Sequence, residues 1–206
     1  MFDGIIFDVD GTLWDSTPVV EEAWNQAFID NGIDDIRVDA DRLKGLFGLP
    51  MDDIIDDLMP NYPVDFRREF GPKCFQYEEE FLKKKPGIQY PGLEKTLSEL
   101  SKKYPLFIVS NCQAGYIELF CEKTGLGKYI TDHCCPGDTG LLKADNIKLI
   151  AKNNNLKNPV YVGDTQMDAN ACEAAGVKMI FASYGFGKVK EPDYTIRSFE
   201  ELLDIL

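Results

Sequence analysis

The chain has 206 residues, of which 44% are hydrophobic and 28% charged, which is typical of one globular domain or one domain with a modest insertion. It carries 22 Lys and Arg residues against 35 Asp and Glu residues, a formal net charge of −13. Because so acidic a surface repels phosphates and anionic headgroups, we expect neither nucleic acid nor a membrane as a partner. An anionic ligand would need a local positive field at its site.

The start of the chain resembles no targeting segment. Met1-Phe2-Asp3-Gly4 leads directly into an apolar run, without a basic region or a small-residue cleavage site. No apolar run approaches the roughly 20 residues needed to span a bilayer. The spacing of the six cysteines matches no zinc pattern, and we expect them to be reduced. These features predict a cytoplasmic protein.

After a first predicted strand at 5–7, helical patterns occupy residues 16–88. Ser16-Thr17-Pro18 is typical of a helix start, and further helices are predicted from Asp39 and Asp52. A stripe at helical spacing then predicts a helix core, with a kink or break at Gly71-Pro72; it comprises Phe66, Phe70, Cys74, Tyr77 and Phe81. Since no strand-like run interrupts this segment, it predicts an all-helical insertion.

Beyond the insertion, short apolar strands alternate with helices. Strands are predicted at 106–109, 160–162 and 179–182. Helices are predicted before Gly125, over 145–153, from about 168 to Gly176, and over 198–206. Continuous apolar strands alternating with helices predict an α/β fold in which a parallel sheet is covered on both faces.

The first strand ends in two acids, Asp8 and Asp10, followed by Gly11 and Thr12. Residues at i and i+2 point to the same side of a strand, and ligands of open α/β sheets bind beyond the carboxyl ends of the strands. Two like charges so close need a cation or a shared proton. Oxygen ligands without nearby Cys or His favour a hard cation, so the sequence predicts bound Mg²⁺.

Polar residues also follow the other predicted strands. Ser110 and Asn111 follow the strand at 106–109, and Asp164 and Asp168 follow the strand at 160–162. Lys143 precedes a predicted helix. We expect all of them at the same edge of the sheet.

This set of motifs resembles that of the haloacid dehalogenase-superfamily phosphatases, specifically phosphoglycolate phosphatase-like members with a helical C1-type cap. The resemblance covers the whole chain and implies a Rossmann-like core at 1–15 and 89–206, with a helical cap at 16–88. It implies Asp8 as the nucleophile and Asp10 as the general acid and base. It also implies phosphate contacts by Ser110 and Lys143, metal-binding acids at Asp164 and Asp168, and Mg²⁺ held by Asp8, Asp164 and the carbonyl of Asp10. The hydroxyl of Thr12 and the amide of Asn111 are further candidates for substrate contacts. We expect Asp168 to orient Lys143 or a metal-bound water rather than to bind the metal directly.

The resemblance implies Mg²⁺-dependent hydrolysis of small phosphorylated metabolites, such as phosphoglycolate or a sugar phosphate, through an aspartyl-phosphate. Asp10 disfavours dehalogenases and phosphonate hydrolases. A β-phosphoglucomutase-type phosphomutase is the alternative, disfavoured because the sole histidine, His133, lies off every motif. A phosphate sensor without turnover is a third interpretation, disfavoured because all the motif acids are intact. We expect a monomer, with a dimer as the alternative.

Two positions depart from the family pattern, and one cap residue is a further candidate. Ala144 follows Lys143 where the family often has Pro, and Cys112 follows Ser110-Asn111 where a basic residue or Thr is usual. For Cys112 we weigh packing at a helix start against a redox-sensitive thiol at the rim of the site. In similar proteins the loop between the first two cap helices faces the nucleophile. We therefore hypothesise that Lys44 contacts a second part of the substrate.

Overall fold

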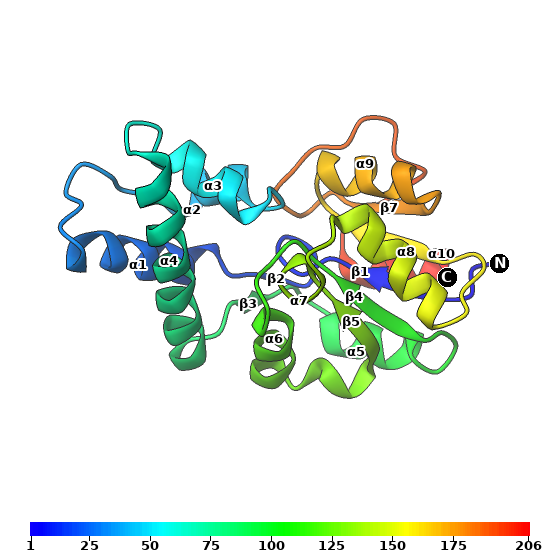
Figure 1. Ribbon diagram of the computed structural model, residues 1–206. Helices are drawn as coiled ribbons and strands as arrows, with labels where there is room; N and C mark the ends of the chain where they lie inside the picture. Colours follow the sequence, from blue (N-terminus) through cyan, green and yellow to red (C-terminus); the bar gives the residue numbers. More distant parts are fainter.

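The computed structural model describes residues 1–206 and contains a six-stranded sheet in the order β5-β4-β1-β6-β7-β8, in which every pair is parallel. Figure 1 shows this sheet on one side of the molecule and a group of helices on the other. The strands are β1 (Ile5–Phe7), β4 (Leu106–Val109), β5 (Ile130–Cys134), β6 (Val160–Gly163), β7 (Lys178–Ala182) and β8 (Tyr194–Ile196). Of the six strands of this sheet, only the two edge strands, β5 and β8, were not predicted, because polar residues interrupt their apolar pattern.

The central strands are buried on both faces by helices. Ile5 and Phe7 of β1 point to one apolar cluster, while Ile6 between them points to another, as the two-residue period of a strand requires. The first cluster contains residues of α5 (Leu93–Leu100), α6 (Tyr116–Thr124) and α10 (Leu202–Ile205); the second contains residues of α8 (Lys143–Asn153) and α9 (Gln166–Ala175). Short helical turns complete this part at η1 (Leu126–Tyr129), α7 (Pro136–Thr139) and η2 (Phe199–Glu201).

Four helices between β2 and β3 form a separate unit with its own apolar core, which we call the helical unit (Figure 1). They are α1 (Thr17–Asp30), α2 (Ala40–Leu46), α3 (Met51–Leu58) and α4 (Val64–Lys84). A kink or a break was predicted at Gly71-Pro72. The helix does not break there, because α4 is continuous through Pro72. The buried residues Phe70, Gly71 and Cys74 pack this stretch into the unit, which offsets the cost of roughly 3 kcal/mol for an interior proline.

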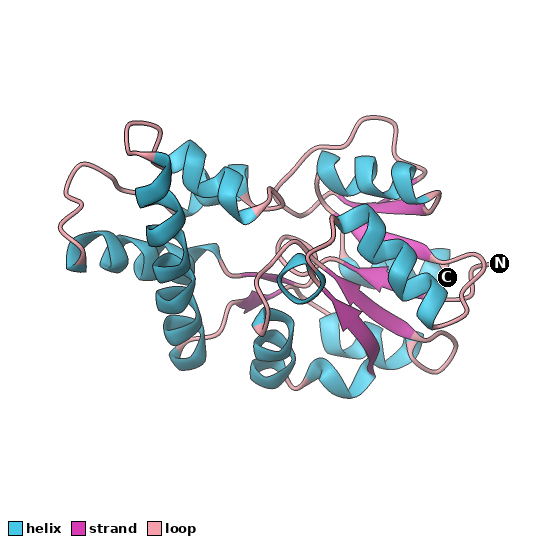
Figure 2. Ribbon diagram, viewed as in Figure 1, coloured by secondary structure: helices cyan, strands magenta, loops and turns pink.

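A two-stranded antiparallel ribbon joins the two parts where the chain crosses between them. It pairs β2 (Trp14–Asp15) with β3 (Ile88–Gln89) and is visible in magenta between the parts in Figure 2. Gly87 packs so closely on the buried Trp14 that an added Cβ would lie 2.8 Å from Cδ2 of the indole. Neither strand was predicted, since two residues are too short to show a period. No helix in the structure has the length and apolar character of a membrane span.

Candidate active site

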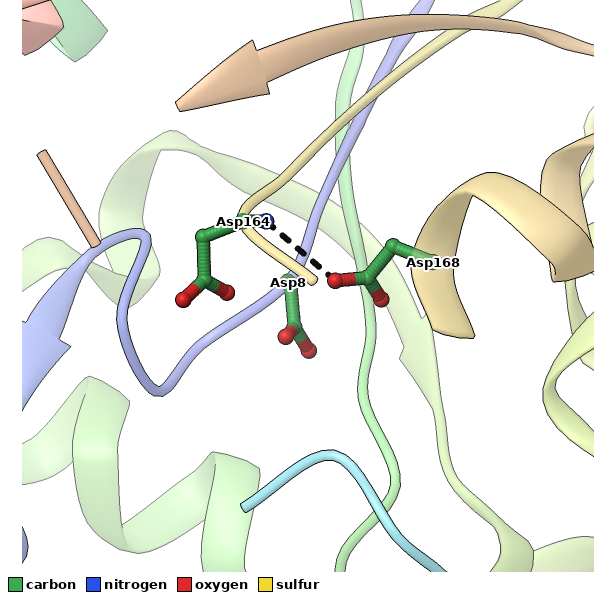
Figure 3. A group of neighbouring side chains, drawn as sticks. All are labelled: Asp8, Asp164 and Asp168. Carbon is green, nitrogen blue, oxygen red and sulfur yellow. Dashed lines mark hydrogen bonds between the residues drawn. The ribbon is translucent and has the colours of Figure 1, made fainter. Parts of the chain in front are cut away.

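The strand order places the ends of β4, β1 and β6 side by side, and this brings the predicted motif residues together. Asp8 follows β1, Ser110 follows β4 and Asp164 follows β6, and all three are buried. Carboxylate oxygens of Asp8, Asp164 and Asp168 lie within 4.8 Å of one another. Figure 3 shows Asp8, on the segment after β1, facing Asp164 and Asp168, which belong to the stretch that leads from β6 into α9. The sequence-based expectation that they share one edge of the sheet therefore agrees with the structure.

Lys143 is the one buried Lys or Arg of the chain, and it lies among these acids. As the first residue of α8 it places Nζ 3.1 Å from Oδ1 of Asp8 and 2.6 Å from Oδ1 of Asp168. Burial opposes its charge, but the two carboxylates prevail and hold the pKa of Lys143 above its usual value. Lys143 therefore stays cationic beside Asp8.

Both carboxylate oxygens of Asp168 accept hydrogen bonds from other groups of the protein. Its Oδ2 accepts hydrogen bonds from the backbone N–H groups of Asp164 and Thr165, at 3.2 and 2.9 Å, and from the Thr165 hydroxyl at 2.7 Å. Thr165 and Asp168 also form the capping box that begins α9. Although burial disfavours its charge, Lys143 and Thr165 hold the pKa of Asp168 below its usual value. Asp168 is therefore arranged to position Lys143 and the Asp164 backbone.

Asp164 sits in a cradle made by glycines and a backbone amide. Its Oδ2 accepts from the N–H of Phe186 at 2.7 Å, and a Cβ on Gly11 would lie 2.1 Å from that same oxygen. Gly11 also has φ +79°, which favours glycine, and a Cβ on Gly185 would come within 2.5 Å of Oδ2. The Thr12 hydroxyl approaches the other carboxylate oxygen at 3.5 Å.

The electrostatics of this acid cluster fit a bound divalent cation. Three carboxylates face a single ammonium group, so ionised side chains leave two negative charges without a partner. Burial raises the pKa of Asp8 to about 6 against the effect of Lys143, and burial together with Asp168 and Asp8 raises the pKa of Asp164. A hard cation between Asp8 and Asp164 would reverse both shifts.

The Asp10 side chain points to a different set of neighbours. Its Oδ1 accepts hydrogen bonds from Ser16 Oγ at 2.5 Å, from the Tyr116 hydroxyl at 2.9 Å and from the Trp14 indole at 3.1 Å. Burial nevertheless raises the pKa of Asp10 to about 7. A carboxyl group that titrates near neutrality is suited to give and take protons. Sequence reasoning missed Ser16 and Tyr116 as partners, because neither belongs to a local motif.

A cavity between the sheet and the helical unit opens onto Asp8 and Asp10. From the sheet side it is lined by Asp8, Asp10, Ser110, Asn111, Cys112, Gln113 and Tyr116, and from the helical unit by Trp24, Phe47, Gly48, Met51, Ile54 and Glu78. Asn111 Nδ2 donates to the carbonyl of Gly48 at 2.8 Å and so connects the two walls. Glu78 was not singled out in the sequence, because the run Glu78-Glu79-Glu80 looks like a solvated helix face.

Four further residues that the sequence analysis considered are Lys44, Thr12, Cys112 and His133, and their surroundings differ from one another. Lys44 does not line the cavity; its Nζ lies 3.2 Å from Oδ2 of Asp15 and 5.8 Å from the centre of the Phe186 ring. The Thr12 carbonyl accepts from the Tyr184 hydroxyl at 2.9 Å, so this residue is tied to the loop after β7. Cys112 lines the cavity, but burial raises the pKa of its thiol, which favours the packing role. His133 lies within β5, away from the cavity.

Comparison with known proteins gives both family and fold. The profile of the haloacid dehalogenase-like hydrolase family matches residues 5–182. A phosphoglycolate phosphatase of Photobacterium profundum is 26% identical over 220 residues, which cover 98% of this chain and 94% of that protein. A phosphoglycolate phosphatase of Pseudomonas fluorescens is 28% identical over 193 residues, which cover 88% of this chain and 70% of that protein. The structure of a haloacid dehalogenase-like hydrolase from Streptococcus pneumoniae superposes with a TM-score of 0.86 at 22% identity, covering 99% and 98% of the two chains. The predicted family resemblance and fold class are confirmed.

Proposed function

Because this chain belongs to the haloacid dehalogenase-like hydrolase family, we propose that it is a Mg²⁺-dependent phosphatase that hydrolyses small phosphomonoesters through an aspartyl-phosphate on Asp8. The observation that carries the proposal is the position of Asp8, buried at the end of β1 with the Lys143 ammonium 3.1 Å away and Asp164 beside it. The two phosphoglycolate phosphatases similar to this chain support a phosphomonoester as the substrate.

The metal would be held by the carboxylates of Asp8 and Asp164 together with the main-chain carbonyl of Asp10, while Asp168 positions the residues around it. When bound, Mg²⁺ supplies the positive charge that offsets the negative charge of the phosphoryl oxygens. Lys143 and Ser110, both buried at the same sheet edge, are placed to hold further phosphoryl oxygens.

In the first step, an oxygen of Asp8 bonds to phosphorus while the bond from phosphorus to the ester oxygen breaks. Asp10 gives its proton to the departing oxygen, and its pKa near 7 makes the protonated form available. In the second step, Asp10 takes a proton from water, whose oxygen bonds to phosphorus and releases phosphate from Asp8. Both steps depend mainly on positioning and charge compensation.

The contact between the helical unit and the sheet edge supports hydrolysis in a closed site. Asn111 and Gln113 of the sheet side donate to Gly48 and Glu78 of the helical unit, at 2.8 and 3.1 Å. These contacts enclose Asp8 and limit the access of bulk water to it. No histidine lines the cavity, which favours hydrolysis over the phosphomutase alternative.

The test is a screen of phosphorylated metabolites with and without Mg²⁺, in which released phosphate is measured for the wild type and for Asp8→Asn. Exposed Asp65 on α4 provides the matched control, Asp65→Asn. We expect turnover that requires Mg²⁺, disappears in Asp8→Asn and persists in Asp65→Asn. Full turnover by Asp8→Asn, or full turnover after metal removal, would overturn the proposal. Formation of glucose 6-phosphate from glucose 1-phosphate would instead show a phosphomutase.

A further inference from the structure

The wall that the helical unit contributes to the cavity holds one ionisable side chain, Glu78 of α4. The residues that line the whole cavity include three acids, Asp8, Asp10 and Glu78, and no Lys, Arg or His. Lys143, whose Nζ lies 3.1 Å from Oδ1 of Asp8, lines an adjoining cavity instead, and Lys44 is paired with Asp15. A leaving group in this cavity would therefore meet no cationic side chain on the lining.

Glu78 is fixed in place by two neutral donors. The Trp24 indole donates to Oε2 at 3.0 Å, and the Gln113 amide donates to Oε1 at 3.1 Å. The Glu78 residue is only 4% exposed. Since each carboxyl oxygen can take part in a second hydrogen bond, this group retains hydrogen-bonding capacity toward a ligand in the cavity. One bond comes from the helical unit and the other from the sheet side, so the carboxyl group is held at the boundary between them.

The side chains around Glu78 are suited to contact apolar groups of a ligand rather than charged ones. Trp24, Phe47, Met51 and Ile54 provide the apolar part of the same wall. A leaving-group carboxylate placed here would lose its water and gain no cationic partner, which is strongly unfavourable. A hydroxyl group would lose less on burial and could exchange a hydrogen bond with Glu78.

We propose that Glu78 determines the leaving-group specificity of this enzyme, favouring uncharged hydroxylated leaving groups of the sugar or polyol class and rejecting those that carry a carboxylate. The inference rests on the proposed phosphatase function and narrows its substrate class. Phosphoglycolate, the substrate in the names of the two similar phosphatases, should therefore be a poor substrate of this chain.

The protonation of Glu78 is compatible with this preference. Burial raises the pKa of Glu78 to about 8, so the acid and the carboxylate forms coexist near neutral pH. The acid can donate to a hydroxyl oxygen and the carboxylate can accept from a hydroxyl group. A leaving-group carboxylate is repelled by the charged form and finds no cation beside the neutral form.

Four small esters of similar size test the proposal directly. They are 2-hydroxyethyl phosphate, phosphoglycolate, phosphoethanolamine and ethyl phosphate, which present a hydroxyl, a carboxylate, an ammonium group and no polar group. With Mg²⁺, we expect kcat/KM for 2-hydroxyethyl phosphate to exceed that for phosphoglycolate by at least about tenfold, the effect of about 1.4 kcal/mol. A preference for phosphoglycolate, or for phosphoethanolamine over the hydroxyl ester, would overturn the assignment.

The variant Glu78→Gln keeps the size of the side chain and removes its charge. We expect it to raise the ratio of kcat/KM for phosphoglycolate to that for ethyl phosphate about tenfold. Exposed Glu80, two residues along α4, provides the matched control Glu80→Gln, which should leave the ratio unchanged. If Glu78→Gln lowers turnover of all four esters equally, Glu78 has only a structural role and the proposal fails.

The two proposals fail in different ways. If the wild type hydrolyses none of the four esters and no metabolite of the screen, or if Asp8→Asn stays active, the phosphatase function itself is wrong. If the wild type shows Asp8-dependent turnover with phosphoglycolate as the best ester, the phosphatase function stands and only the role of Glu78 is rejected.

Discussion

The Nζ atom of Lys143 lies 2.6 Å from Oδ1 of Asp168, and both side chains are buried. This ion pair joins the first turn of α8 to the first turn of α9. Because the same ammonium group lies 3.1 Å from Asp8, the pair fixes a positive charge beside the proposed nucleophile.

Asp168→Asn is expected to destabilise the protein, because it leaves the Lys143 charge with a weakened buried partner. Because Asp8 remains 3.1 Å from the Lys143 ammonium, the loss should be smaller than the roughly 3–5 kcal/mol of a fully broken buried pair, about 1–3 kcal/mol. It includes the weakened capping box of α9. Urea unfolding of the metal-free protein measures the loss. Asp65→Asn on the surface should change the free energy of unfolding by less than about 0.5 kcal/mol. Equal stability of the two variants would show that the pair contributes little.

Gly11→Ala is expected to impair Mg²⁺ binding, since the new Cβ would lie 2.1 Å from Oδ2 of Asp164 and displace that carboxylate. We expect the Mg²⁺ concentration for half-maximal activity to rise by at least about tenfold. Gly125→Ala is the matched control, because Gly125 also has a positive φ, +70°, but has no atom within 4 Å of an added Cβ. If both variants need the same Mg²⁺ concentration, backbone strain and not the Asp164 cradle explains any loss.

Tyr116→Phe is expected to shift the pH dependence of turnover. The Tyr116 hydroxyl stabilises the Asp10 carboxylate, so its removal should raise the pKa of Asp10 above its value of about 7, by about one unit. Because the proposed role of Asp10 begins with donation of a proton, the alkaline limb of the kcat/KM profile should move to higher pH. Tyr62→Phe, which removes a Tyr–Asp35 hydrogen bond on the surface, should leave the profile in place. A limb that stays fixed in Tyr116→Phe would argue against Asp10 as the proton donor.

The metal-free protein should lose stability as the pH rises from about 4.5 to about 8. Burial raises the pKa of Glu78 from 4.5 to about 8 and that of Asp10 from 3.8 to about 7, so the folded protein binds protons more tightly than the unfolded chain. Their stabilising effect is complete below the unfolded pKa values and is lost as pH rises through the folded ones. Thermal unfolding in EDTA at pH 5.5 and 8.5 measures this loss of stability, and we expect a lower Tm at pH 8.5. Each kcal/mol lost from the free energy of unfolding should lower Tm by about 2–4 °C.

Glu78→Gln provides the comparison for that measurement. Because the amide does not titrate, the fall in Tm between the two pH values should be smaller in the variant, whereas Glu80→Gln should behave as the wild type. A Tm that rises with pH in EDTA would mean that Glu78 and Asp10 are not buried as protonatable groups in the folded protein.

The sequence was most informative where function depends on the ends of apolar strands. Asp8, Ser110 and Asp164 each follow a short buried run, and the parallel order of β4, β1 and β6 brings them together. Local pattern suffices in these cases because the direction of a strand also sets the direction in which its last residues point. A different local signal, an alanine-rich run that ends at Gly176, predicted α9 from about Asp168, and the structure has this helix at Gln166–Ala175.

The residues that were missed depend on contacts between distant segments. Glu78 lies in an acidic run on a helix, and only the packing of α4 against α1 and Gln113 buries it. Tyr116 meets Asp10 across 106 residues of sequence. Lys44 illustrates the reverse case. It was expected in a loop that faces the nucleophile, but it lies in α2 and is held by Asp15 outside the cavity. Charge and spacing alone could not separate these environments.

Covalent capture of the phosphoryl group by Asp8 can be measured by acid quenching during turnover of a ³²P-labelled ester with Mg²⁺. We expect radioactive protein whose label is released by hydroxylamine, as for an acyl phosphate. The label should map to the peptide that contains Asp8 and should be absent from Asp8→Asn. Rapid turnover without any labelled protein, or label on another residue, would contradict covalent capture by Asp8.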